Sequence, residues 1–149
     1  MDYARLTSQD FQKKHRAIED TVYAILGSIR SQSVVRARMR LLSEQIASYL
    51  SYQEDGFYTH MNKSYAGNHQ ALKMLEFLSN DVKYIMSRYL KFFDRFSEDK
   101  DVAVWRNFPR EFSTFSRELM ARFQVEKDYL FPLMDQLHMT PPEQPPAAE

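Results

Sequence analysis

A carboxylate lies where the sequence otherwise predicts a hydrophobic core. Between residues 112 and 137, apolar side chains recur at steps of three, four and seven, which is typical of a helix with one core-facing side. Glu126 projects onto the centre of that side, between Phe123 and Leu130. A buried carboxylate needs a partner or must be neutral. Arg122 stands one helical turn earlier, so the sequence predicts an ion pair between Arg122 and Glu126.

Other polar side chains interrupt the apolar sides of the remaining predicted helices. In a helical bundle they are expected at the same end as Glu126, and they are His15, Gln53, Glu54, His60 and His69. In one interpretation they belong to a polar layer inside the bundle, which fixes the register of the helices. Glu126 then pairs with Arg122, and the remaining hydrogen bonds come from His15, Gln53 or His60.

The alternative interpretation is a metal site, because histidines and carboxylates from several helices of a bundle hold non-haem iron. Glu54 and His69 are separated by 15 residues, and in this spacing the chain resembles hemerythrin-like domains. The ligand set that this resemblance implies is His15, Glu54, His69 and Glu126. Three positions where that family has histidine carry other residues here, namely Leu50, Lys73 and Arg122 or Phe123. We therefore predict that the chain binds no metal and no other cofactor.

Four amphipathic helices are available to position these side chains. The first is capped by Thr7 or Ser8 and ends before a turn at about 30–33, and the second runs from about 34 to 62. A turn at 65–68 leads into a third helix, at about 69–97. Gly56 is expected to bend or loosen the second helix.

A connector at 102–111 precedes the last helix. Its Trp105 and Phe108 are expected to cover the open end of the core, and Pro109 starts the helix. Pro132 predicts a kink or a short final segment after Asp128. The fold class is therefore all-α, an up-down-up-down antiparallel four-helix bundle over residues 1–139. Residues 140–149, rich in proline, are expected to form a disordered tail.

Composition excludes several classes of function. The chain has 149 residues, 20 basic and 20 acidic, so net charge gives no argument for direct binding of nucleic acid. Cysteine is absent, which leaves no disulfide and no thiolate metal site. The polar N-terminal stretch is not a signal peptide, and no apolar run suits a membrane span, so we expect a cytoplasmic protein without a membrane partner. No nucleophile elbow or phosphate-binding loop occurs, so we expect no enzyme.

A second resemblance extends from Tyr49 to Asp135. The segment YLSYQEDGFYT matches a motif of the Rsd/AlgQ family of anti-sigma factors at Tyr49, Leu50, Ser51 and Tyr58. The chain also has the Gly-Asn-x-Gln turn of this family, at Gly67, Asn68 and Gln70. The family's last helix carries LxARFxxE, present here as Leu119, Ala121, Arg122, Phe123 and Glu126.

This resemblance implies a four-helix bundle that binds the primary sigma factor and keeps it from core RNA polymerase. The residues implied in partner binding are Tyr49, Ser51, Glu54, Asp55, Tyr58, Arg122, Phe123 and Glu126. Because the DNA-reading surface of a sigma factor is basic, the partner surface should offer carboxylates with apolar anchors. Further carboxylate candidates are Glu19, Asp20, Asp94, Glu98, Asp99 and Asp101. Arginines gather around the first turn, at Arg30, Arg36, Arg38 and Arg40, where we expect a solvated face.

Overall fold

The computed structural model describes residues 1–96 and 102–139, and within them all regular structure is helical. Four long helices account for most of these residues: α1 (Ser8–Gly27), α2 (Gln32–Ser51), α4 (His69–Arg95) and α6 (Phe108–Val125). Shorter elements join or extend them: η1 (Tyr3–Arg5), α3 (Asp55–Ser64), α5 (Val102–Trp105), the π-helix η2 (Glu126–Leu130) and α7 (Phe131–Met139). The expectation of an all-α fold is confirmed.

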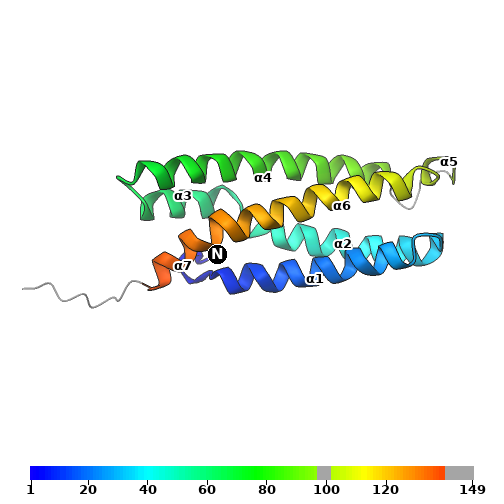
Figure 1. Ribbon diagram of the computed structural model, residues 1–149, viewed down its shortest axis with the longest axis horizontal. Helices are drawn as coiled ribbons and strands as arrows, with labels where there is room; N and C mark the ends of the chain where they lie inside the picture. The colour runs from blue at the N-terminus through cyan, green and yellow to red at the C-terminus, as the bar shows by residue number, and fades with distance from the viewer. Residues whose placement is uncertain (97–101, 140–149) are drawn as a thin grey trace, which may run out of the picture.

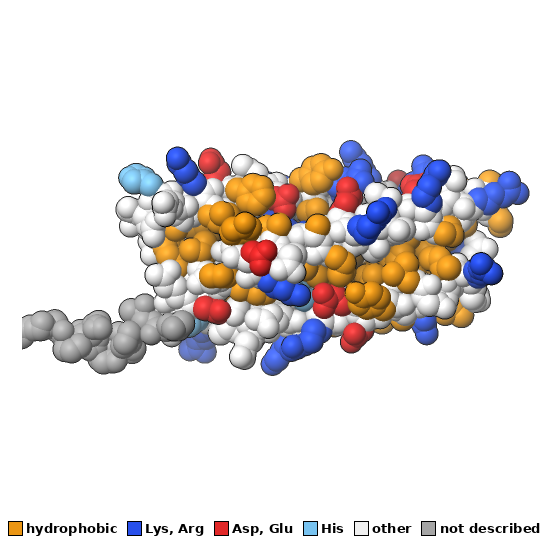
Figure 2. Space-filling model, viewed as in Figure 1, with side chains coloured by type: hydrophobic (Ala, Val, Ile, Leu, Met, Phe, Trp, Pro, Cys, Tyr) orange, Lys and Arg blue, Asp and Glu red, His pale blue; other side chains and the backbone are white. Residues whose placement is uncertain are grey.

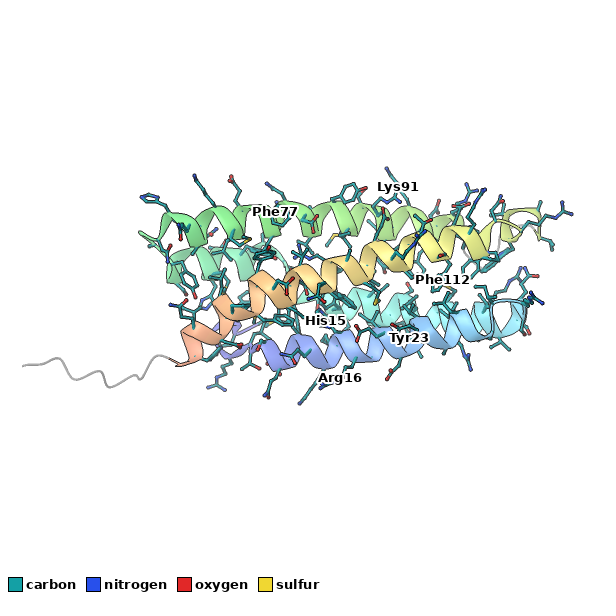
Figure 3. All side chains as sticks on the ribbon, in the orientation of Figure 1. His15, Arg16, Tyr23, Phe77, Lys91 and Phe112 are labelled. Carbon is teal, nitrogen blue, oxygen red and sulfur yellow. The ribbon has the colours of Figure 1, made fainter. Side chains whose placement is uncertain are left out.

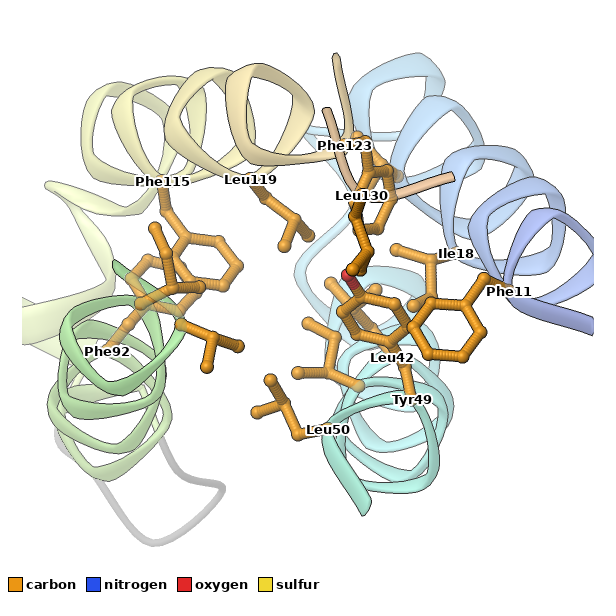
Figure 4. Close-up of a cluster of buried hydrophobic side chains, with 14 of the residues drawn as sticks. Phe11, Ile18, Leu42, Tyr49, Leu50, Phe92, Phe115, Leu119, Phe123 and Leu130 are labelled. Atoms are coloured by element: carbon orange, nitrogen blue, oxygen red, sulfur yellow. The ribbon is translucent and has the colours of Figure 1, made fainter. Parts of the chain in front are cut away.

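The four long helices lie side by side along the longest axis of the molecule (Figure 1). The chain reverses direction between α1 and α2, between α3 and α4, and between α4 and α6, which gives the up-down-up-down order that the sequence predicts. α1 packs on α2, and α4 packs on α6. Side chains from all four converge on one core, including Phe11 of α1, Leu42 of α2, Phe92 of α4 and Leu119 of α6 (Figure 4).

Local sequence signals explain where these helices begin. The Thr7 hydroxyl accepts from the Asp10 N–H while the Asp10 carboxylate accepts from the Thr7 N–H, so α1 opens on a reciprocal capping box. The Asn68 side chain caps α4 by accepting from the Ala71 N–H. Gly67 has a φ of 87°, a conformation that glycine adopts without strain, and so ends the turn before α4.

The predicted second helix is wrong in one respect, because it is broken into α2 and α3. α2 ends at Ser51 and α3 begins at Asp55, so the interruption falls before Gly56 rather than at it. In the interruption the Gln53 side chain turns into the interior. Gly56 has a different role: a Cβ at this position would lie 2.7 Å from Cε2 of Tyr3, so glycine allows the Tyr3 ring to approach α3.

The last helix follows its prediction more closely. Pro109 lies in the first turn of α6, and Trp105 and Phe108 are buried at this end of the core. The segment before Pro132 is the π-helix η2, which the Phe131 N–H closes by donating to the Glu126 carbonyl. This wider turn accommodates a proline that has no N–H to donate and whose ring would clash in a regular helix. A short final helix, α7, follows as expected.

Three expectations lie outside the described residues: the disordered tail at 140–149, the predicted end of the third helix at about residue 97, and the acidic candidates Glu98, Asp99 and Asp101. Among residues 1–96 and 102–139, no helix combines the length and the hydropathy that crossing a membrane requires.

Candidate functional site

Arg122 and Glu126 form an ion pair deep in the bundle. Arg122 Nε lies 2.7 Å from Glu126 Oε2, and both side chains have 0% of their surface exposed. The two residues face the core because they lie one turn apart on the apolar side of α6 and its π-helical extension. The ion pair predicted from their spacing is confirmed.

Every N–H of the Arg122 guanidinium has an acceptor. Beside the Nε bond to Glu126, Nη1 donates to the Leu78 carbonyl at 3.1 Å and to Asp81 at 2.9 Å. Nη2 donates to the Gln53 amide oxygen at 2.8 Å and to the Tyr58 hydroxyl at 3.2 Å. Arg122 therefore connects α6 to α4, to α3 and to the α2–α3 break in a single side chain.

The Glu126 carboxylate is equally well satisfied. His15 Nε2 lies 2.7 Å from Oε1, and the Gln53 amide donates to Oε2 at 2.6 Å. The Tyr49 hydroxyl lies close enough to this carboxylate for each group to shift the pKa of the other. Gln53 also donates to the Tyr49 hydroxyl at 2.8 Å and accepts from the Tyr58 hydroxyl at 2.6 Å. We call this group the interior polar cluster: His15, Tyr49, Gln53, Tyr58, Asp81, Arg122 and Glu126.

His15 joins the cluster from α1 and points into the bundle (Figure 3). Its ring stacks on Phe123, with centroids 3.8 Å apart and planes 12° apart. Because Glu126 accepts, Nε2 must carry the proton in this contact. The buried Nδ1 has no hydrogen-bond partner among the described residues. With the proton on Nε2, Nδ1 is an acceptor, and leaving this acceptor without a partner costs less than leaving the N–H donor without one.

The electrostatics favour the charged forms of the central pair. Burial alone would raise the pKa of Glu126, but the hydrogen bond to His15 and the charge of Arg122 outweigh it and hold that pKa below its ordinary value. Burial would lower the pKa of Arg122, yet the negative charge of Glu126 raises it. Burial raises the pKa of Tyr49 and of Tyr58, so both phenols stay protonated as donors. The cluster thus holds a charged Arg122–Glu126 pair, with the Asp81 carboxylate as a second partner of the guanidinium and protonated phenols at Tyr49 and Tyr58.

This geometry confirms the polar layer and defines its members more narrowly. Of the residues expected to complete the hydrogen bonding, His15 and Gln53 do so. His60 does not: it is half-buried and lines a groove with Tyr3 and Met134. Apart from the partly exposed Asp81, the members of the cluster are all buried, and their contacts join α1, α2, α3 and α4 to α6 and η2.

The structure does not assemble the alternative metal ligands. His15 and Glu126 contact each other, whereas Glu54 and His69 are exposed at the starts of α3 and α4. Within residues 1–96 and 102–139, no three side chains of His, Asp, Glu or Cys lie close enough together to hold an ion.

The residues implied in partner binding separate into two groups. Five face the interior, where their polar atoms bond one another or their rings pack, so they present nothing to a partner at the surface: Tyr49, Tyr58, Arg122, Phe123 and Glu126. Ser51 is half-buried, and Glu54 and Asp55 are exposed at the α2–α3 break, where Asp55 lies 3.7 Å from Lys83. The motif that carries the Rsd/AlgQ resemblance therefore lies mainly in the core.

The other charged candidates are dispersed over the surface. Glu19 and Asp20 lie on α1, and Asp94 is exposed near the end of α4. Around the first turn, the expectation of a solvated face is wrong for two arginines. Arg38 donates to the Ala24 carbonyl at 2.8 Å, which satisfies the end of α1, and Arg36 lies over the Trp105 ring at 5.0 Å from its centroid.

Some members of the interior polar cluster were not recognised from sequence. Asp81 was missed because it flanks the apolar stripe of α4 and reads as a solvated side chain. The Leu78 carbonyl accepts from Arg122 within a helix, a contact that no residue pattern signals. Spacing alone does give one useful signal. Tyr49 and Gln53 are four residues apart on a core-facing side, and so are Arg122 and Glu126.

No protein-family model, no curated protein and no solved structure matches the chain, so its function is inferred from its own geometry and from the sequence resemblance.

Proposed function

We propose that the chain is a protein-binding regulator of transcription that sequesters the primary sigma factor from RNA polymerase, as its resemblance to Rsd/AlgQ anti-sigma factors implies. In this proposal the interior polar cluster keeps the bundle rigid, and the binding surface lies elsewhere. The observation that supports it most is an exposed face of α1 on which carboxylates and apolar side chains lie together.

This α1 outer face consists of Glu19, Asp20, Tyr23 and Leu26. Tyr23 lies four residues after Glu19 and three after Asp20, and Leu26 lies three residues after Tyr23, so each of them neighbours Tyr23 on the surface of α1. Tyr23 is 65% exposed and Leu26 is 40% exposed, so both present apolar surface beside the two carboxylates. Figure 3 labels Tyr23, and Arg16 two turns earlier on the same helix.

Such a face suits the chemistry of a basic partner. Carboxylates complement a DNA-reading surface and speed its encounter, while an exposed tyrosine supplies the apolar anchor that dominates binding energy. Glu19 lies 3.9 Å from Lys127, a loose pair between partly exposed side chains that a partner's arginine can replace. Glu54 and Asp55 at the α2–α3 break provide a second, smaller group of exposed carboxylates.

The experiment is a pull-down with purified primary sigma factor. The test variant combines Asp20→Lys with Tyr23→Ala on the α1 outer face. The matched control combines Glu76→Lys with Tyr84→Ala, which makes the same chemical change on exposed positions of α4. We expect the parent and the control to retain sigma factor and the α1 variant to lose at least about tenfold in affinity. A parent chain that fails to retain sigma factor contradicts the proposal.

A further inference from the structure

A second charged surface lies between α4 and α6, and its sign is opposite to that of the α1 outer face. The groove there has a volume of about 250 Å³ and is lined by four cations, Arg88, Lys91, Arg95 and Arg110, by Glu111 and Thr114, and by the rings of Phe92 and Phe115. Figure 2 shows Lys and Arg side chains gathered where these two helices meet, toward the α5 end of the molecule. We call this surface the α4–α6 groove.

The cations of the groove have a regular arrangement. Arg88, Lys91 and Arg95 follow one another at steps of three and four on α4, so they line one side over about 10 Å. Arg88 is held by Glu118 at 2.9 Å, and Arg95 by Glu111 at 2.9 Å. These two ion pairs fix the ends of the row.

Two cations of the groove remain available: Lys91, which lies between Arg88 and Arg95 on α4, and Arg110, which precedes Glu111 on α6. Both are exposed, and neither forms an ion pair within the part of the chain that the structure describes. Lys91 lies on α4 (Figure 3), and Arg110 is contributed by α6 on the other side of the groove. An anion seated between the two helices would meet a cation on each side.

The floor of the groove is apolar. Phe92 and Phe115 stack face to face, with centroids 4.4 Å apart and planes 2° apart. Their exposed fractions are only 8% and 5%, so they offer an edge for an aliphatic side chain rather than a face on which a nucleic-acid base could stack. A groove between two parallel rods, with an apolar floor and cationic walls, suits an amphipathic helix.

We propose that the α4–α6 groove binds an acidic amphipathic helix of a partner protein, with glutamates or aspartates one turn apart meeting Lys91 and Arg110 and an aliphatic residue between them resting on Phe92 and Phe115. Charge complementarity selects the acidic partner, and the covered rings disfavour a nucleic acid. The inference does not depend on the proposed binding of sigma factor, because it concerns other helices and a partner of opposite charge.

The test uses the full chain and a fluorescein-labelled helical peptide made of Leu, Ala and Glu, with its glutamates on one side. A second peptide carries Lys in place of every Glu, and a single-stranded oligonucleotide is the third probe. The groove variant is Lys91→Glu with Arg110→Glu. The matched control is Lys63→Glu with Lys73→Glu, which changes net charge equally at exposed positions near the opposite end.

Fluorescence anisotropy should show binding of the acidic peptide to the parent and to the control variant, and the unlabelled lysine peptide should not displace it from the groove. The groove variant should lose at least about tenfold in affinity, because two attractive contacts become repulsive. Lys91→Ala with Arg110→Ala should also weaken binding, which keeps the test informative if the charge reversals disturb folding.

Three outcomes would overturn the inference. The first is an acidic peptide that does not bind the parent chain. The second is an equal loss of affinity in the groove and control variants, since net charge alone would then explain the binding. The third is an oligonucleotide that binds more tightly than the peptide and is lost in the groove variant, which would assign the groove to nucleic acid.

Discussion

Arg122 forms five hydrogen bonds, more than any other side chain of the interior polar cluster. Its removal in Arg122→Ala leaves Glu126 charged and buried, with Asp81, Gln53 and Tyr58 each losing a partner. We expect a loss of roughly 3–5 kcal/mol in the free energy of unfolding, the usual effect of leaving one member of a buried ion pair unpaired. Urea unfolding measures it.

Glu126→Gln should lower the free energy of unfolding less than Arg122→Ala does, because the amide oxygen still accepts hydrogen bonds from Gln53 and Arg122. The double substitution Arg122→Met with Glu126→Leu removes both charges and should be nearer to neutral than Arg122→Ala, since apolar groups then fill the site. If Arg122→Ala unfolds at the same urea concentration as the parent, the buried ion pair contributes nothing and this explanation of the core is wrong.

The lowered pKa of Glu126 gives stability a pH dependence. A carboxyl with a folded-state pKa below its unfolded value stabilises the fold above the unfolded value, and this contribution is lost as pH falls through the folded value. The parent should therefore lose stability below the ordinary glutamate pKa of 4.5. Glu126→Gln cannot titrate at this position, so its urea midpoint should fall less over the same acid range. Equal falls in the two proteins would assign the acid sensitivity to other carboxylates.

Sequence reveals the centre of the cluster but not its outer partners. The Arg122–Glu126 pair follows from local geometry, because side chains one turn apart meet on any helix. His15 and Gln53 were recognised as polar groups on apolar sides. Asp81 and the Leu78 carbonyl depend on how far α4 is rotated and shifted against α6, which a residue pattern does not specify.

Among the elements, the α2–α3 break is where local propensity and tertiary structure disagree most. Periodicity favours one helix from about 34 to 62, because the apolar side continues across it. The chain departs from the helix at Tyr52–Glu54, where Gln53 reaches four members of the interior polar cluster: Tyr49, Tyr58, Arg122 and Glu126. These distant contacts outweigh the helix propensity, which is why sequence alone does not locate the break.

Gly56 at the start of α3 offers a test of packing against η1. Gly56→Ala adds helix propensity but brings a Cβ to 2.7 Å from the Tyr3 ring, which must then move away from Phe57. In a Tyr3→Ala background that clash is absent. The change that Gly56→Ala makes in the free energy of unfolding should therefore be more favourable there by more than about 0.5 kcal/mol. A double-mutant cycle by urea unfolding measures the difference. An identical effect in both backgrounds would mean that Tyr3 does not pack on α3.

For the whole molecule, composition and periodicity suffice to predict an all-α bundle with a single core. The same information predicts little stability from residues 140–149, because their side chains include nothing apolar larger than Ala or Pro. Deleting them should change the free energy of unfolding by less than about 0.5 kcal/mol, as measured by thermal or urea unfolding. A large fall in melting temperature would show that the prolines pack on the bundle.

The surface is less predictable than the core, because any exposed charge reads as solvated until its neighbours are known. The structure brings Tyr23 beside the carboxylates of α1 and gathers the cations of α4 and α6 in a groove. Residues that the resemblance implied as contacts, such as Tyr49 and Arg122, lie instead in the interior. The bundle therefore combines a rigid core with two charged surfaces of opposite sign.

Hydrogen exchange of the full chain, with and without purified primary sigma factor, tests the central functional claim most directly. The account predicts slower exchange in peptides that cover Arg16–Leu26 of α1, where binding would bury the outer face, and unchanged exchange at the start of α4. The interior polar cluster should already be protected in the free protein. Exchange that sigma factor leaves unaltered throughout the chain, or slows everywhere except α1, would contradict the account.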